Sequence, residues 1–483
     1  MWPWATTRNP ARTTISVVYW HRGRIGPPQR RPDSTVDVFW AAPVAHTRGG
    51  RGFPRPPFFG SAPLLHAYFN TLRGFNRTLR LYLLCAALIG FTTSGGIYSV
   101  LLNLYLLRLD YSLAFIGLIN AMGALSYALF GLPAGYLGRR WGSRRATIVG
   151  LAFMLAGNLL LPLVEYTPAH WHDAWLLSAR LPRAFGFALY LVNANPFLMD
   201  VATPQERTHV FSVQAALWPL AGFAGSLVAG FLPGFFADFS GLTERDPAPF
   251  RYTLLLGAAG LAPALLALLA TPKTEGQPLP QETAKPSGPA PRRAPLVVAA
   301  AVTLLLTAGV GAVQSFFNLY LDEGLGTSTA LIGSLAAAGQ LLGGMAALAT
   351  PLLSARLGLV ALISGGALAT SIGLLPLALV PHWGAAGLGF LAVSAMGTLR
   401  HAALMVFQQE LVPRHWRPTM SALHAVASGL SFAAIALGGG YLVPLLGYRS
   451  LFLLAAALLV LGGLIFAAYF RRPRGEYKRT ATP

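Results

Sequence analysis

The sequence predicts an all-α integral membrane protein in which twelve transmembrane helices form two pseudo-symmetric six-helix bundles. Three observations support this fold class: the composition, a series of long apolar segments, and an internal repeat. Of the 483 residues, 54% are hydrophobic and only 11% are charged, and the mean hydropathy is +0.54. A water-exposed surface needs more charge than this, so the composition excludes a cytosolic enzyme or a secreted domain.

The segment 1–77 is expected to be a disordered basic arm. It is rich in Arg, Pro and Gly, shows no helical apolar period, and lacks the apolar core of roughly 7–15 residues that a signal peptide needs. Twelve arginines and only two acids, Asp33 and Asp37, precede residue 81, which accounts for half of the net charge of +20. A second interpretation stays open, in which translation starts further on and this segment is not part of the natural protein.

From Arg80 onward, twelve apolar segments are each long enough to cross about 30 Å of hydrocarbon at about 1.5 Å per residue. The first six form an N-terminal bundle over 78–271 and the last six a C-terminal bundle over 296–471. Residues 272–295 are polar and Pro-rich, which predicts a cytoplasmic linker, and 472–483 form a basic cytoplasmic tail. The expected spans are 80–107, 113–137, 145–166, 174–200, 206–236, 250–271, 296–322, 329–353, 357–380, 384–411, 417–445 and 449–471.

The two halves repeat each other at a nearly constant offset, which predicts duplication with parallel topology. The string Asn-Leu-Tyr-Leu begins at Asn103 and again at Asn318, 215 residues later. Arg140 and Gly142 recur as Arg356 and Gly358, at an offset of 216. At an offset of 210, Phe197, Asp200 and Arg207 match Phe407, Glu410 and Arg417.

The loop charges predict the orientation in the membrane. Basic residues gather in the loops after even-numbered spans and acids in the opposite loops, so the positive-inside rule places both termini in the cytoplasm. The expected location is the plasma (inner) membrane, crossed by a multi-pass chain. Because topology accounts for the basic residues, no nucleic-acid partner is expected.

The loop between spans two and three carries a recognisable motif. It reads Gly135-Tyr136-Leu137-Gly138-Arg139-Arg140-Trp141-Gly142-Ser143-Arg144-Arg145. This resembles the signature of the major facilitator superfamily, G-x-L-x-D-R-x-G-R-R, although Arg139 stands where the family usually has an aspartate. With the twelve spans and paired halves, the resemblance covers residues 80–471. It implies the fold of that family and a secondary transporter that rocks two bundles around a central site.

The motif residues also predict a cytoplasmic gate. Gly135 would let span two approach a neighbouring helix, and Gly142 would permit a tight turn. Arg139, Arg140 and Arg144 can bond helix-end carbonyls and carboxylates. We expect Asp200 to pair with this arginine cluster and Glu410 to pair with Arg356, in contacts that break when the bundles rock. A simpler interpretation is that the charges only anchor helix ends and enforce topology.

Charged groups inside hydrocarbon are costly and therefore mark candidate transport residues. None of the carboxylates lies near the middle of a predicted span, but Arg400 and His401 lie near the middle of span ten. Arg400 either neutralises an anionic substrate or braces the second bundle. His401 either carries a proton or is a hydrogen-bonded interior histidine. Arg180 and Arg183, in the outer third of span four, are expected to snorkel to water.

Amides, hydroxyls and rings on the spans predict a polar-lined cavity with aromatic walls. Each of these side chains has an alternative role in hydrogen bonding between helices of one bundle. The cavity candidates besides Arg400 and His401 are Asn103, Tyr190, Asn193, Asn195, Gln214, Trp218, Gln314, Asn318, Gln340 and His424.

We therefore expect a secondary active transporter of a small organic solute that works by alternating access, with protons as a candidate coupling ion. The alternative is a polytopic membrane protein that transports nothing, such as an assembly subunit or a sensor. An enzyme is not expected, and neither are a catalytic residue, a cofactor or a metal: Cys85 is the single cysteine, and His170 with His172 is the nearest approach to a metal site. The expected partners are the solute and the lipid bilayer, and the expected oligomeric state is a monomer.

Overall fold

The computed structural model describes residues 74–93, 95–272, 293–413 and 416–472. Nearly all of the predicted basic arm 1–77, linker 272–295 and tail 472–483 therefore lies outside the described residues. The described residues are helical almost throughout, and no strand occurs among them.

The first bundle corresponds to six predicted spans, and the helix ends agree with the predicted bounds to within a few residues. Span one is divided into two helices, and span six is divided at Gly260. The helices are α2 (Arg77–Thr92), α3 (Ile97–Arg108), α4 (Leu113–Trp141), α5 (Ser143–Leu160), η1 (Leu161–Tyr166), η2 (Ala169–Trp171), α6 (His172–Val201), α7 (Pro204–Ser240), α8 (Pro247–Ala259) and α9 (Leu261–Leu269).

The second bundle contains the other six spans in five helices and a short π-helical extension. They are α10 (Arg293–Leu319), η3 (Tyr320–Gly324), α11 (Thr329–Leu357), α12 (Leu359–Leu379), α13 (Trp383–Glu410) and α14 (Arg417–Phe470).

The described helices confirm the predicted fold class. Eleven helical runs are long and apolar enough to cross a membrane. The last of them, α14, has 54 residues, which would extend about 80 Å as one helix, far more than the roughly 30 Å of hydrocarbon. Gly447 interrupts it with φ 78° and ψ 167°. The chain therefore turns at this glycine, and α14 supplies two spans, which brings the total to twelve.

The internal repeat is visible in the helix ends. α4 begins after Ser112, whose Oγ accepts a hydrogen bond from the N–H of Phe115, and α11 begins in the same way after Ser328. Both helices have 29 residues. They end at Gly142 (φ 85°, ψ 150°) and Gly358 (φ 77°, ψ 155°), a backbone conformation that favours glycine. The expected tight turn at Gly142 is thus present in both halves.

Each bundle has its own aromatic core. In the first bundle, the ring of Tyr82 lies 5.6 Å from that of Phe197. In the second, the ring of Phe407 lies 5.0 Å from that of Phe466 and 4.9 Å from that of Phe470. All five side chains are buried. These contacts pack helices of the same bundle against one another.

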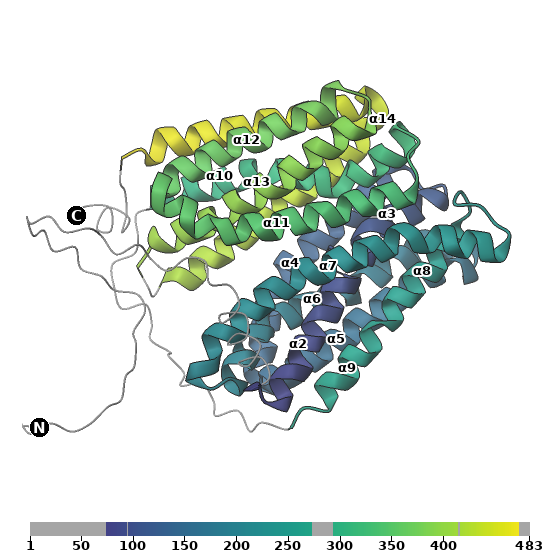
Figure 1. The fold of residues 1–483 in the computed structure, drawn as a ribbon, viewed down its shortest axis with the longest axis horizontal. Helices are drawn as coiled ribbons and strands as arrows, with labels where there is room; N and C mark the ends of the chain where they lie inside the picture. The colour runs from purple at the N-terminus through teal and green to yellow at the C-terminus, as the bar shows by residue number, and fades with distance from the viewer. Residues whose placement is uncertain (1–73, 94, 273–292, 414–415, 473–483) are drawn as a thin grey trace, which may run out of the picture. The chain divides into compact units, whose positions relative to one another are not determined.

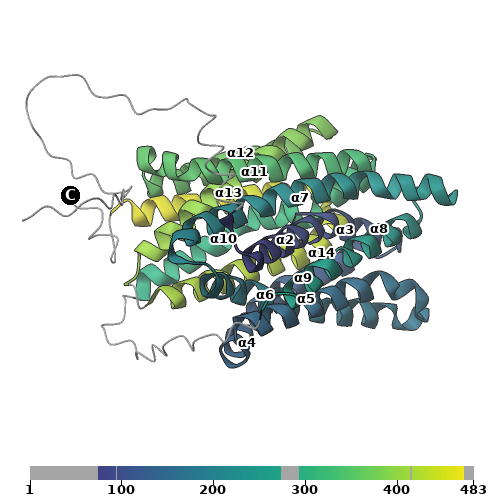
Figure 2. The same cartoon turned by 60° about the horizontal axis from the view of Figure 1, so that its bottom comes forward.

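The most extensive contacts between the bundles are those of α7 with α11 and of α4 with the first half of α14, and α3 also contacts α10. Figure 1 shows the purple-to-teal bundle and the green-to-yellow bundle close together near α3 and diverging toward the opposite end. Figure 2 shows α7 and α11 side by side from a second direction. We call the end at which α9 finishes and α10 begins the linker face. The other end, which carries Arg108 and Asp322, is the far face.

Candidate functional site

A cavity of about 680 Å³ lies between the two bundles, and we call it the inner cavity. Helices α3, α4 and α6 line it from the first bundle, and α10, α13 and α14 from the second. Its polar wall contains four of the predicted candidates as well as side chains that the sequence did not single out. The polar and charged lining residues are Thr93, Tyr98, Ser99, Asn103, Asn120, Arg180, Arg183, Gln314, Ser315, His401, Ser421, His424 and Ser428.

A second space of about 870 Å³ adjoins the first, and we call it the side cavity. It shares His401, Ser428 and Phe432 with the inner cavity. Trp218, Gln340 and Arg400, all predicted candidates, line it together with several apolar side chains. Among the latter, Met345 is 59% exposed and Leu348 is 76% exposed. The side cavity therefore extends between α7 and α11 to the surface of the molecule.

Arg180 and Arg183 do not snorkel to water, contrary to expectation. Arg180 is only 7% exposed, and its guanidinium lines the inner cavity. Nε of Arg183 donates to Oδ1 of Asn158 at 2.8 Å, and its guanidinium lies over the ring of Tyr98. The prediction placed them only by depth along span four. The face of α6 on which they lie directs both inward, and Arg180 lies against Gly123 of α4, which leaves room for its head group.

Arg400 and His401 lie in the interior of α13, as predicted. Arg400 is 2% exposed and lines the side cavity, while His401 lines both cavities. Among the described residues, Nε of Arg400 has no hydrogen-bond partner, and neither do Nε and Nη1 of Arg180. No Asp or Glu occurs among the described residues that line either cavity. The two bundles thus present buried cations to two adjoining cavities, which share three lining residues.

His424 is held in a defined hydrogen-bond chain. Thr303 Oγ1 donates to the carbonyl of Ala299, so it accepts from Nε2 of Gln408 at 2.7 Å. Oε1 of Gln408 is then the acceptor for Nδ1 of His424, also at 2.7 Å. This assignment leaves Nε2 of His424 as the acceptor for the hydroxyl of Ser428 at 3.3 Å. The ring of His401 lies 5.3 Å from that of His424, so the two histidines form a pair on the cavity wall.

The first span is broken beside the inner cavity. α2 ends at Thr92 and α3 begins at Ile97, and no side chain caps the N-terminus of α3. Thr93 and Ser99, on either side of the break, line the cavity. Gly95 has φ +84°, and a Cβ there would collide with the amide of Gln340 from the other bundle. The Gly95-Gly96 pair was a visible signal for this break that the sequence analysis did not use.

Asn103 and Asn318 join the bundles by equivalent hydrogen bonds. Nδ2 of Asn103 donates to the carbonyl of Ser315 at 2.8 Å, and Nδ2 of Asn318 donates to the carbonyl of Val100 at 3.0 Å. Ser315 follows Val100 by the same 215 residues that separate the two asparagines. Oδ1 of Asn103 also accepts from Asn120 at 3.0 Å. Asn103 lines the inner cavity, whereas Asn318 lies beyond it toward the far face.

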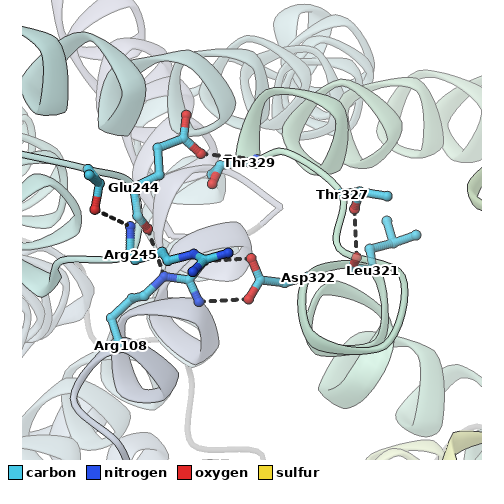
Figure 3. Close-up of polar contacts among 8 residues, drawn as sticks. Arg108, Glu244, Arg245, Leu321, Asp322, Thr327 and Thr329 are labelled. Atoms are coloured by element: carbon cyan, nitrogen blue, oxygen red, sulfur yellow. Dashed lines mark hydrogen bonds and ion pairs between the residues drawn. The ribbon is translucent and has the colours of Figure 1, made fainter.

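An ion pair joins the bundles at the far face. Both terminal nitrogens of Arg108 donate to the carboxylate of Asp322, at 2.6 and 2.7 Å, and the two side chains are 14% and 10% exposed. Nε of Arg108 donates to the carbonyl of Glu244 at 2.8 Å, and the carboxylate of Glu244 accepts from the N–H of Thr329. Figure 3 shows these contacts. From the sequence, Arg108 and Asp322 were expected only as loop charges, but both follow the repeated Asn-Leu-Tyr-Leu string.

Besides Asn318, four predicted cavity residues line neither cavity. Tyr190, Asn193 and Gln214 are packed inside the first bundle: Asn193 donates to the carbonyls of Ala134 and Leu189, and Gln214 donates to the hydroxyl of Tyr82. Asn195 is exposed. The expectation that these four line the cavity does not hold, and Asn193 and Gln214 form their hydrogen bonds within the first bundle instead.

The predicted pairing of Asp200 with the arginine cluster is not present. Asp200 instead accepts a hydrogen bond from the hydroxyl of Ser143 at 2.6 Å. Arg144 donates to Thr271 Oγ1 at 2.8 Å and to the carbonyls of Leu269 and Thr271 at 3.0 and 2.6 Å. The end of α9 leaves these carbonyls without helical partners, which explains the preference. Arg139 and Arg140 are exposed.

The predicted pair of Glu410 and Arg356 is also not present: the ion pairs among the described residues are Arg108 with Asp322 and Arg251 with Glu165. The repeated arginines at the linker face bond carbonyls instead. Arg207 donates to the carbonyl of Met199, and Arg417 to that of Gln409, both at 3.2 Å and both eight residues back along the chain.

The close helix approach expected at Gly135 occurs at Gly138. A Cβ on Gly135 would meet Val192 and Arg139 only at 3.8 and 3.9 Å, which is ordinary contact. A Cβ on Gly138 would collide with the amide of Asn193 on α6. Both glycines lie against α6, which carries Val192 and Asn193, but only at Gly138 is the approach too close for a Cβ.

A comparison of the sequence with family profiles agrees with the fold and its paired halves. The family profile described as Major Facilitator Superfamily matches residues 83–436, and a second match covers residues 299–482. The chain belongs to the Major Facilitator Superfamily. A comparison with curated proteins finds no significant match.

Solved structures of transporters share the fold of this chain. A D-xylose-proton symporter has a TM-score of 0.66 at 15% identity, over 85% of this chain and 99% of its own. A variant of the nucleoside transporter NupG has a TM-score of 0.65 at 15% identity, over 81% of this chain and 100% of its own. The xylose transporter XylE from E. coli, in an inward open conformation, has a TM-score of 0.65 at 15% identity, over 84% and 99%. Identities this low indicate a shared fold only.

Proposed function

We propose that this superfamily member is a secondary active transporter of a small organic solute that works by alternating access. The observation that carries the proposal is the pair of adjoining cavities between two packed bundles, lined by charged and polar side chains from both. Such a crevice at the interface of two related halves is where secondary transporters bind their substrates. Similar folds occur in sugar, nucleoside and peptide transporters.

The distribution of contacts supports one state of the transport cycle. All hydrogen bonds between described residues of the two bundles lie in the half of the molecule nearer the far face. In order of distance from the cavity, they involve Asn103 and Asn318, then Arg108, and finally Glu244 in the loop. The bundles diverge toward the linker face (Figure 1). With the linker face in the cytoplasm, as the positive-inside rule predicts, this is an inward-facing state.

Proton coupling through the paired histidines is the finer part of the proposal. His401 and His424 lie on the cavity wall, and the cavity lining offers no Asp or Glu among the described residues. Histidine is the side chain whose charge changes most readily near neutral pH. His424 is engaged by Gln408 and Ser428, so His401 is the better candidate to exchange a proton with water in the cavity.

A transport assay with purified protein in lipid vesicles tests the proposed function. Vesicles are incubated with a pool of metabolites, and their contents are measured by mass spectrometry. We expect at least one solute to enter faster than it enters empty vesicles. The matched control carries Arg108→Cys and Asp322→Cys joined by a short bismaleimide, which holds the far face closed and should abolish entry. Cys85 is buried, so it offers little competing reactivity.

The competing proposal is a polytopic membrane protein that transports nothing, such as an assembly subunit or a sensor. It predicts that free and cross-linked protein behave as empty vesicles do for every solute in the pool. Entry of a solute into vesicles with free protein, and its loss on cross-linking, would exclude this alternative.

A further inference from the structure

We infer that the substrate is an organic anion with an apolar body, and that Arg180 of the first bundle and Arg400 of the second provide the positive charge that attracts it. This inference rests on the proposed transport function and names the class of its substrate. It depends on three features of the cavities: buried guanidinium groups without partners, the lack of a compensating acid, and the apolar wall of the side cavity.

The first feature is the unsatisfied hydrogen-bonding capacity of the arginines. Arg180 is 7% exposed and lines the inner cavity, and Arg400 is 2% exposed and lines the side cavity, which shares three lining residues with the inner one. Nε and Nη1 of Arg180 and Nε of Arg400 lack a hydrogen-bond partner among the described residues. A buried ionised group without a partner is strongly destabilising. Such a group within a membrane protein is retained where function requires it.

The second feature is the charge of the surroundings. Arg183 adds a second guanidinium to the inner cavity, and its bond to Asn158 is to a neutral amide. The uncapped N-terminus of α3 begins beside Thr93 and Ser99 of the same wall and contributes a partial positive charge. No Asp or Glu lines the described part of either cavity. An anion entering this space would therefore meet an excess of positive charge at low dielectric, where Coulomb attraction is strong.

The third feature gives the ligand its apolar part. The side cavity is lined by Phe390, Leu341 and Met345 besides Arg400, and it shares Phe432 with the inner cavity. A carboxylate, phosphate or sulfonate alone would leave these surfaces in contact with water. An anionic head on an alkyl or aryl body satisfies both the guanidinium groups and the apolar wall. A neutral or cationic solute would leave the arginines uncompensated.

The two arginines belong to opposite bundles, so an anion held between them would link the halves through their charges. Arg180 on α6 and Arg400 on α13 lie on helices whose contact with each other across the cavity is slight. Binding would thus be sensitive to the removal of either charge. It would be far less sensitive to the removal of an arginine outside the cavity, and this difference is measurable without transport.

The test is ligand-dependent thermal stabilisation of the purified full-length protein in detergent. The probes are matched pairs of a carboxylate and its primary amide: acetate and acetamide, hexanoate and hexanamide, phenylacetate and phenylacetamide. We expect hexanoate or phenylacetate to raise the apparent melting temperature. The concentration needed for half of the maximal stabilisation should be at least tenfold higher for the matching amide and for acetate. Arg180→Gln and Arg400→Gln should each abolish the preference for the carboxylate over the amide. Arg449→Gln, an exposed arginine of the far face, is the matched control and should leave it unchanged.

Several outcomes would overturn the inference. They are equal stabilisation by acids and amides, no stabilisation by any acid at the highest concentration, or a carboxylate preference that survives both Gln variants. If a Gln variant fails to fold, Arg180→Lys and Arg400→Lys retain the charge and should retain the preference. Because binding in detergent requires no translocation, carboxylate binding without vesicle entry would refute the proposed transport while leaving the inference intact. If only neutral solutes enter the vesicles, the proposed transport function stands and the inference of an anionic substrate fails.

Discussion

Arg108 and Asp322 form a bidentate ion pair that joins the two bundles at the far face (Figure 3), and each lies five or fewer residues after an equivalent asparagine of the internal repeat. The duplicated segments thus carry opposite charges at nearly equivalent positions. The two halves meet at a pseudo-symmetric surface, so equal charges at equivalent positions would repel each other. The opposite charges of Arg108 and Asp322 attract each other instead. The pair lies at the one end of the crevice where the bundles are in contact.

Removal of Arg108 should open the far face more often. Arg108→Ala leaves a carboxylate that is 10% exposed without its partner, which we expect to cost the closed state about 1–2 kcal/mol. A cysteine placed at Ser99, on the inner cavity wall, should then react roughly 5–30-fold faster with an impermeant maleimide added at the far face. The charge-swapped double variant, Arg108→Asp with Asp322→Arg, should restore slow labelling. Unchanged labelling in Arg108→Ala would show that the ion pair does not hold this face closed.

Asn103→Ala and Asn318→Ala should destabilise the contact between the bundles by similar amounts. Each variant removes one hydrogen bond to a backbone carbonyl of the other bundle, worth about 1 kcal/mol. Thermal unfolding of both single variants and the double variant measures this. Asn195→Ala, at an exposed position of α6, is the control and should have little effect. A large loss for one asparagine and none for the other would contradict the pseudo-symmetric role.

Gly138→Ala should be destabilising, whereas Gly135→Ala should be tolerated. The new Cβ at Gly138 would collide with the side chain of Asn193, and the resulting overpacking costs about 1–3 kcal/mol. At Gly135 the nearest neighbours lie at contact distance, so the apparent melting temperature should stay near that of the parent protein. The reverse order of melting temperatures would place the close approach at Gly135 after all.

His401→Gln should abolish accumulation of substrate driven by a pH gradient while downhill equilibration survives. Glutamine keeps polar groups on the cavity wall but cannot carry a proton. Uptake into vesicles with and without a pH gradient provides the measurement, and His170→Gln, at an exposed loop position, is the control. A His401→Gln protein that still concentrates substrate on a pH gradient would exclude His401 as the proton carrier.

Much of the fold was predictable because a lipid environment requires a clear pattern of apolar residues along the sequence. Spans need long apolar segments, so all twelve could be located, with the end of span two predicted at 137 and found at Trp141. The offset of about 215 residues predicted the equivalence of Asn103 and Asn318, and the turn at Gly142 followed from residue type. The division of span one at Gly95 was missed because the analysis weighed hydropathy and not backbone conformation.

The site was predicted less completely, because depth in the membrane says little about direction around a helix. Arg400 and His401 were placed correctly at the centre, where any ionisable group is unusual. Arg180 lies nearer the far face and was assigned to water, although α6 directs it into the cavity. Asn193, three turns further along the same helix, was assigned to the cavity and braces α4 instead.

By itself, the sequence determined that this chain spans a membrane twelve times, in two related halves with an ionisable centre, because burial in hydrocarbon and gene duplication both act on residue type and spacing. Only the tertiary structure decided which side chains face one another. The ion pair of Arg108 with Asp322 and the unpartnered guanidinium of Arg180 both depend on helix rotation and on contact between segments far apart in the chain. Those quantities arise from the packing of all twelve helices together, and no local pattern encodes them.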